Sequence, residues 1–227
     1  MAKEQYTEIQ DLTADELKEK ANGFFEEYKN LIFGLIGGIL LLIVGLYWYV
    51  QSSGEKNEEA QVELYKANVE FKRDSFQLAL NGRNIPGQAS NFIGYTGIIE
   101  DYGGTAAANL AHYYAGIATL QLGQPQLALD FLTNFSGEEL MQTQAYTLIG
   151  DAHSELQQMD EALSAYESAA ANTENMALAM FAKWKAARLL EFQGKVEEAK
   201  QYLQDIMDKD PETAERLGVD KDLIRLS

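Results

Sequence analysis

Two stretches of the sequence decide the fold. Residues 116–132 read GIATLQLGQPQLALDFL, and residues 150–166 read GDAHSELQQMDEALSAY. Aligned at a spacing of 34 residues, each has a small residue, a second small residue twelve positions later and a bulky residue four further on. The matching pairs are Gly116 and Gly150, Ala128 and Ala162, and Leu132 and Tyr166. Because small residues let helices approach closely and a bulky one fills the remaining gap, this pattern predicts repeated helix–turn–helix units.

A third unit repeats the pattern with Ala187, Ala199 and Leu203, offset by 37 residues instead of 34. We expect the three extra residues in a loop near 172–175. A helix–turn–helix period of this length resembles the tetratricopeptide repeat (TPR). The turns within the units are expected at Gly123, Gln157 and Gly194. The predicted repeats cover about 109–142, 143–178 and 180–213.

The pattern weakens upstream of these repeats. Ala67 and Ala79 keep the spacing of twelve, but Arg83 occupies the position of the bulky residue. The predicted elements are helices over 55–72 and about 91–102, with a short helix and the loop 81–89 between them. Terminal repeats are atypical because they cap the stack, so we interpret 55–102 as capping helices.

An uncharged stretch precedes the repeats, since residues 31–50 read LIFGLIGGILLLIVGLYWYV. Twenty helical residues span about 30 Å, the thickness of the hydrocarbon core of a bilayer. A cleaved signal peptide would have a shorter apolar core behind a short basic head, whereas 30 residues with more acids than lysines stand here. We therefore predict an all-α protein with a single N-terminal transmembrane helix followed by a TPR-like helical solenoid.

The predicted layout is an acidic head over 1–30, the transmembrane helix over 31–50 and a soluble domain over 51–227. In the head, Thr13 and Glu16 have capping-box spacing, which predicts a helix from Ala14. Lysine is more frequent just before the span than just after it, which favours a cytoplasmic N-terminus. The lysines compared are Lys18, Lys20 and Lys29 before the span and Lys56 after it.

Three glycines share one face of the predicted transmembrane helix: Gly34, Gly38 and Gly45. Small residues let helix backbones approach closely in lipid, so this face is a candidate for packing against a partner helix. Glycine is also simply frequent in transmembrane helices, and both interpretations remain open.

Composition excludes several functions. The net charge of -17 argues against nucleic acid as a partner, and the lack of cysteine excludes disulfides and thiolate chemistry. The two histidines, His112 and His153, have no histidine or cysteine at ligand spacing. We find no catalytic constellation, cofactor motif or metal motif, and expect a protein that is not an enzyme.

Binding residues are expected on a concave face lined by the first helices of the repeats. The positions in register are Leu110, Tyr113, Ile117 and Leu120, then Gln144, Thr147, Asp151 and Ser154, then Phe181, Trp184, Arg188 and Glu191. The apolar and basic members at the two ends would contact a protein partner or an unfolded client. Alternatively, Tyr113 and Ile117 pack against the helix at 91–102, and Trp184 is covered by a C-terminal helix near 213–217.

The stretch IIEDYGGTAAANLAHYYAGIATLQLGQPQLAL, residues 98–129, resembles envelope TPR proteins of Bacteroidota. The layout of acidic head, Phe24-Phe25, one span, an aromatic exit and repeats is similar to the YfgM-like family. That resemblance implies an inner-membrane protein with a periplasmic domain and no catalytic residues. It also implies an ancillary role at the SecYEG translocon beside a PpiD-like membrane-anchored chaperone, which receives unfolded secretory clients. The alternative is a TPR scaffold of another envelope complex, in outer-membrane biogenesis or secretion.

Overall fold

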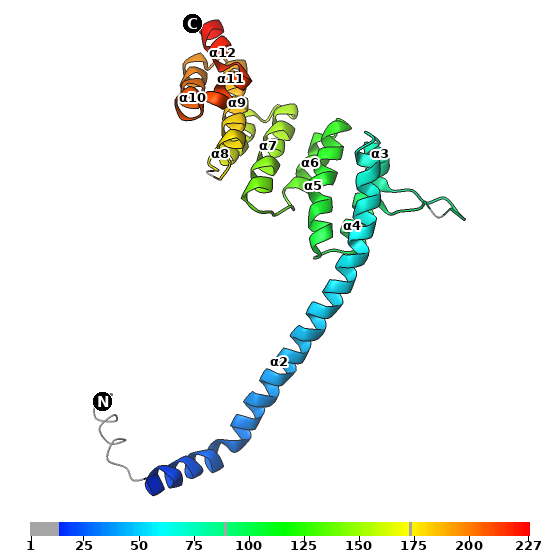
Figure 1. Cartoon of the computed structure of the whole chain (residues 1–227), viewed down its shortest axis with the longest axis vertical. Coiled ribbons are helices and arrows are strands. Elements are labelled where there is room, and N and C mark those ends of the chain that lie inside the picture. The colour runs from blue at the N-terminus through cyan, green and yellow to red at the C-terminus, as the bar shows by residue number, and fades with distance from the viewer. Residues whose placement is uncertain (1–13, 89, 173) are drawn as a thin grey trace. The chain divides into compact units, whose positions relative to one another are not determined.

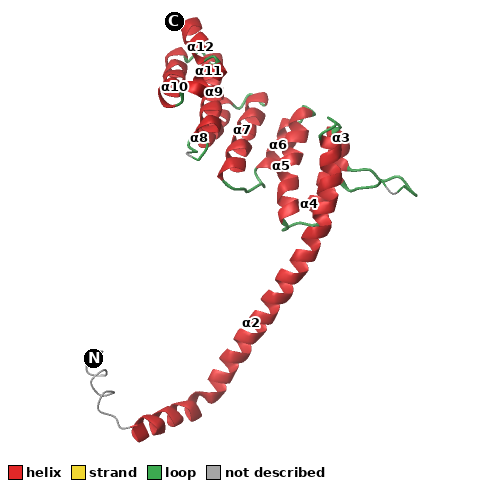
Figure 2. Ribbon diagram, in the orientation of Figure 1, coloured by secondary structure: helices red, strands yellow, loops and turns green. Residues whose placement is uncertain are grey.

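The computed structural model describes residues 14–88, 90–172 and 174–227, which form two compact units, Met1–Gly54 and Glu55–Ser227. Every regular element in those ranges is an α-helix, and their one β-type pairing is an isolated bridge between Arg83 and Phe92 (Figure 2). The predicted all-α fold is confirmed. The helices are α2 (Ala14–Phe71), α3 (Phe76–Asn81), α4 (Gly94–Asp101), α5 (Ala106–Gln121), α6 (Pro125–Leu132), α7 (Glu139–Glu155), α8 (Met159–Ala170), α9 (Met176–Phe192), α10 (Val196–Lys209), α11 (Pro211–Leu217) and α12 (Val219–Leu226).

The first unit contains the N-terminal part of α2. Its window Glu27–Val44 is long and apolar enough to cross a membrane, judged by length and composition, and none of it is buried by protein. This window overlaps the predicted span. A β-carbon added to Gly34 or Gly38 would meet no atom within 4 Å, so these glycines face open space. Thr13, Gly45 and the aromatic residues at 47–49 lie outside the residues whose surroundings the structure describes.

The second unit is built around three helix pairs, α5 with α6, α7 with α8 and α9 with α10, which follow one another along the chain (Figure 1). The small and bulky residues of the predicted pattern meet where the paired helices cross. A β-carbon on Gly116 would lie 2.4 Å from Cγ of Leu132, and one on Gly150 would lie 2.4 Å from Cε1 of Tyr166. In the third pair, the corresponding residues Ala187, Ala199 and Leu203 are at most 1% exposed.

The turns within the pairs are at the predicted positions. Gly123, Gln157 and Gly194 have φ angles of 69°, 59° and 76°. This left-handed conformation carries the chain from one helix to the next, and glycine adopts it without steric cost. Gln157 is the exception, because a side chain in this region is strained.

The end of α2 with α3 and α4 caps the stack at its N-terminal end. Ala67 and Ala79 are completely buried, and the hydroxyl of Tyr95 in α4 donates a hydrogen bond to Oδ1 of Asn68 at 2.7 Å. Helix α4 begins at Gly94, three residues later than predicted. The reason is that Phe92 forms the bridge with Arg83, while the Asn91 side chain hydrogen-bonds to both the backbone nitrogen and the carbonyl of Ile85.

Two short helices close the C-terminal end. Helix α10 ends at Lys209, and Pro211 stands in the first turn of α11. Asp210 caps α11 by accepting a hydrogen bond from the backbone nitrogen of Thr213 at 3.1 Å. Val219, the first residue of α12, is fully buried in the cluster that joins α9 to α12.

Candidate protein-interaction face

The first helices of the three pairs, α5, α7 and α9, carry two adjoining hollows. We call this surface the first-helix face. The first hollow, of about 400 Å³, is mainly apolar, and we call it the apolar hollow. Its lining includes Tyr113, Ile117, Thr147, Leu148, Leu178 and Phe181. The second, of about 590 Å³, is lined by more polar residues, among them Ser154, Glu155, Tyr166, Trp184 and Arg188. Asp151 and Lys185 line both hollows.

The structure brings most of the predicted concave-face residues to these hollows. Tyr113, Ile117 and Phe181 line the apolar one, and Trp184 and Arg188 line the second. Leu110 and Leu120 lie outside both linings, because each packs into the cores beneath the first helices. Among the polar positions, Gln144, Thr147 and Asp151 line the apolar hollow, and Ser154 lines the second.

Tyr113 belongs to a core cluster that includes residues of α5, α6 and α7. Only 8% of it is exposed, its ring contacts that of Phe135 at 5.1 Å between centroids, and its hydroxyl donates to Oε1 of Gln144 at 2.8 Å. The neighbouring Tyr114 makes the contact with α4 by stacking on Tyr95 at 5.9 Å. Tyr113 therefore presents a small, hydrogen-bonded part of its surface to the hollow.

An ion pair separates the two hollows. The Lys185 ammonium lies 2.8 and 3.1 Å from the carboxylate oxygens of Asp151, which also accepts a hydrogen bond from the Tyr166 hydroxyl at 2.7 Å. Burial and the charge of Asp151 raise the pKa of Tyr166 well above its ordinary value. The Tyr166 hydroxyl therefore stays protonated and remains a hydrogen-bond donor to Asp151.

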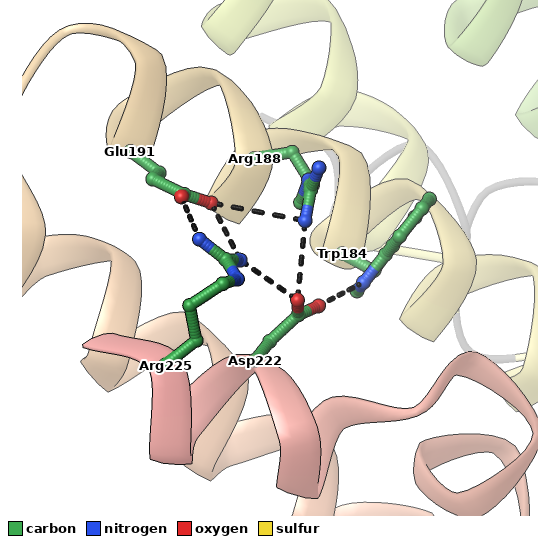
Figure 3. Close-up of polar contacts among 5 residues, drawn as sticks. All are labelled: Trp184, Arg188, Glu191, Asp222 and Arg225. Atoms are coloured by element: carbon green, nitrogen blue, oxygen red, sulfur yellow. Dashed lines mark hydrogen bonds and ion pairs between the residues drawn. The ribbon is translucent and has the colours of Figure 1, made fainter. Parts of the chain in front are cut away.

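A second network covers the far end of the first-helix face (Figure 3). Asp222 of α12 accepts a hydrogen bond from Nε1 of Trp184 at 2.9 Å and pairs with Arg188 at 3.1 Å. The guanidinium of Arg188 also lies over the Trp184 ring, 5.7 Å from its centroid. Arg225 completes the network by binding Glu191 and, at 2.8 Å, Asp222. Trp184 is therefore covered by C-terminal helices: Asp222 of α12 binds it, and the core cluster that it joins includes Ala214 and Leu217 of α11.

Charge balance in this network follows from burial and pairing. Burial acts to raise the pKa of Asp222, but hydrogen bonds from Arg225 and Trp184 and the charge of Arg188 outweigh it, so that pKa is lowered. A hydrogen bond from Arg225 likewise lowers the pKa of Glu191. Both carboxylates are thus ionised at neutral pH.

Sequence reasoning missed Lys185, Asp222 and Arg225, although a signal was present. The pairs Arg188–Asp222 and Glu191–Arg225 join residues 34 apart, the period of the first two repeats, and Asp151–Lys185 has the same separation although its two repeats are offset by 37. Opposite charges at one repeat spacing face each other on successive helices of a stack. By this spacing, α12 occupies the position that the first helix of a fourth repeat would take next to α9.

The histidines show no metal-site geometry. In the described ranges no three His, Cys, Asp or Glu side chains group in a way that could hold a metal ion. His153 pairs its Nδ1 with Oε1 of Gln158 at 2.7 Å. His112 lies beside Phe131, and burial lowers its pKa, which favours the neutral form.

Comparison with known proteins finds a family match for the third helix pair. Residues 181–213, which contain most of α9 and all of α10, match the tetratricopeptide repeat family. The chain is similar in structure to a Podospora anserina protein described as a kinesin light chain with nearly identical TPR-like repeats. The identity is 14% and the TM-score 0.48, over 76% of this chain and 83% of that one. No curated protein matches the sequence.

The chain forms a TPR-like helical solenoid, and one of its helix pairs matches the tetratricopeptide repeat family over residues 181–213. It joins this solenoid to one N-terminal helix that is apolar enough to cross a membrane. TPR repeats imply a role in protein–protein interaction, because stacked helix pairs create an extended binding surface. The fold is typical of non-enzymatic scaffolds.

Proposed function

We propose that this protein is a non-enzymatic adaptor that is anchored in a membrane by α2 and binds protein partners through its first-helix face. The observation that carries the proposal is the apolar hollow of about 400 Å³ on the helices that a TPR array uses for recognition. Tyr113, Ile117, Phe181, Trp184 and Arg188 are the proposed contact residues on this face. Leu110 and Leu120 support it from beneath.

The proposed topology has a cytoplasmic head over 1–30, a single span over 31–50 and a periplasmic domain over 51–227. The lysines on the N-terminal side of the span support this orientation, as does the resemblance to the YfgM-like family. Gly34, Gly38 and Gly45 are proposed to pack against the transmembrane helix of a partner. The space beside Gly34 and Gly38 is open, which leaves room for such a helix.

The cellular role that fits this layout best is that of an ancillary subunit of the SecYEG translocon in the bacterial inner membrane. There the soluble domain would assist a PpiD-like chaperone with emerging secretory proteins. The resemblance of layout to the YfgM-like family supports this role, as does the combination of an apolar hollow and a candidate membrane anchor in one chain.

Site-specific photo-crosslinking in cells tests the adaptor function. A photoreactive amino acid at Ile117 would sit in the wall of the apolar hollow, whereas the same group at Ser164, exposed on α8, serves as the matched control. We expect crosslinks from position 117 to translocon subunits or to a membrane-anchored chaperone, and few from position 164. Crosslinks to outer-membrane assembly proteins would favour the alternative envelope scaffold. Equal yields at both positions would contradict binding through the first-helix face.

A further inference from the structure

The walls of the apolar hollow leave few unused hydrogen-bonding groups for a polar ligand. Tyr113 donates its hydroxyl hydrogen to Gln144, and the hydroxyl of Thr147 donates to the carbonyl of Thr143 at 2.9 Å. Thr143 in turn donates to the carbonyl of Glu139 at 2.8 Å. Since these groups already have partners, the gain on binding must come mainly from burying apolar surface.

Apolar side chains from all three first helices converge on this space. Ile117 comes from α5, Leu148 from α7, and Leu178 and Phe181 from α9, and each is only half-buried. A bulky apolar side chain of a partner would cover them and complete their burial. Removal of this apolar surface from water favours binding.

Helices α4 to α8 carry charged side chains of one sign only, whereas the cations of α9, Lys183, Lys185 and Arg188, are each paired with a carboxylate. Residues 84–182, which contain α4 to α8, include no lysine or arginine and eleven acids. The acids are Glu100, Asp101, Asp130, Glu138, Glu139, Asp151, Glu155, Asp160, Glu161, Glu167 and Glu174. The one cation among the described lining residues is Lys185, and its charge is matched by Asp151 at 2.8 Å.

Three acidic residues, Glu138, Glu139 and Glu174, lie near one another where α7 begins. Glu139 lies one helical turn before Thr143, and Asn172 ties the loop after α8 to both residues, with Nδ2 2.9 Å from the Glu139 carbonyl. The charge of Glu139 is the largest of the causes that raise the pKa of Glu174, and Glu138 adds to it. The charges of Glu138 and Glu139 thus act against ionisation of Glu174, and a cation placed beside these groups would offset that effect.

We propose that the apolar hollow takes a bulky apolar side chain of an extended protein segment that carries lysine or arginine next to that side chain. This proposal rests on the adaptor function and specifies the segment that the adaptor binds. The apolar group supplies the affinity, and the flanking cations supply selection and speed of encounter in the acidic field. Acidic segments, anionic lipid headgroups and nucleic acid are rejected by the same field.

Peptide binding to the full-length protein tests the proposal. The protein is placed in nanodiscs of zwitterionic lipid, and fluorescence anisotropy follows three labelled probes. The first peptide has a Leu-Phe-Leu centre with two lysines on each side, the second replaces the lysines with glutamates, and the third replaces the centre with serines. We expect the first to bind at least about tenfold more tightly than the other two. Empty nanodiscs correct for binding to lipid.

Two variants locate the binding site. Ile117→Lys puts a cation into the wall of the hollow, while Ser164→Lys adds the same charge to an exposed position on α8. Ile117→Lys should weaken binding of the lysine-flanked peptide by about tenfold or more, and Ser164→Lys should weaken it by less than about twofold. Circular dichroism establishes that both are folded. If Ile117→Lys does not fold, Phe181→Ala takes its place, since it removes one half-buried wall without adding a charge.

Two results would overturn the proposal: equal binding of the lysine-flanked and glutamate-flanked peptides, or undiminished binding by the folded wall variant. The proposed function has its own readout in the crosslinks from position 117. Crosslinks without discrimination among the peptides would mean that the adaptor binds a different kind of segment. Loss of both the crosslinks and the peptide binding would contradict both proposals.

Discussion

The side chain of Leu132 fills the space directly in front of the α-carbon of Gly116, so that a β-carbon there would lie 2.4 Å from Leu132 Cγ. Tyr166 stands in the same relation to Gly150 in the next pair. In each case the small residue belongs to the first helix and the bulky one to the second. Both pairs are sixteen residues apart, and this shared spacing reflects the same packing contact in two successive helix pairs.

Gly116→Ala should destabilise the solenoid even though alanine is the better helix former. Leu132 is completely buried and has little room to withdraw, so the added methyl overpacks the crossing at a cost of about 1–3 kcal/mol. For a domain of this size, the melting temperature should fall by about 2–4 °C for each kcal/mol. Thermal unfolding of the full-length protein in detergent, followed by circular dichroism, measures this change.

Gly54→Ala is the matched control, because a β-carbon there meets nothing within 4 Å. The same chemical change at this helical position should leave the melting temperature unchanged or raise it. An equal fall in melting temperature for both variants would mean that the contact with Leu132 is not the reason why alanine destabilises the protein at position 116.

Gln157→Gly should stabilise the protein. Gln157 has a φ of 59°, where the two corresponding turns have glycine. A side chain in the left-handed region costs about 1–2 kcal/mol, of which the greater freedom of glycine in the unfolded chain cancels a part. We expect a gain of up to about 1 kcal/mol in the free energy of unfolding by urea. Gly194→Gln, the reverse change at the equivalent turn, should lose a similar amount, and a gain there would contradict the argument.

The sequence predicts local packing much better than it predicts the site. Gly116 and Leu132 are close in the chain, and their contact follows from helix geometry alone. Tyr113 and Tyr114 are adjacent and chemically equal, and only their different directions on α5 decide that Tyr114 stacks on α4 while Tyr113 faces Gln144. Composition carries no information about that choice.

The sequence does not readily predict which distant helix covers Trp184. Trp184 was expected to be either free or covered by the helix at 213–217. Its partner, Asp222, is 38 residues away and belongs to α12, which follows a left-handed turn at Gly218. The direction of the chain after that turn is set by burial of Val219 and the ion pairs of Asp222, both of which are tertiary effects.

Acid should destabilise the C-terminal end of the solenoid. Pairing lowers the folded-state pKa values of Asp222 and Glu191, and a hydrogen bond from Lys183 lowers that of Asp205. In the unfolded chain these groups titrate near pH 4. Their stabilisation is therefore complete above about pH 5 and is lost as the pH falls through the lower folded values. The melting temperature should decrease between about pH 5 and pH 3 in thermal scans.

The variant Asp222→Asn distinguishes the contribution of this network to acid sensitivity from that of the other carboxylates. Asparagine keeps an oxygen for the indole of Trp184 but loses the charge that Arg188 and Arg225 face. The variant should be less stable at pH 7 and should lose less stability on acidification. Asp220→Asn, at an exposed position on the same helix, should follow the wild-type pH dependence. The same acid response in wild type and Asp222→Asn would rule out Asp222 as a source of the effect.

Ser53→Cys should report which side of the membrane the soluble domain occupies. The chain contains no cysteine, so a single substitution introduces the only reactive thiol. With a cytoplasmic head and a periplasmic domain, a membrane-impermeant maleimide should label this position in intact cells whose outer membrane admits the reagent. Thr7→Cys in the head should react only after lysis. The opposite pattern would place residues 51–227 in the cytoplasm, where they could not meet secretory proteins after translocation, and the proposed role at the translocon exit would fail.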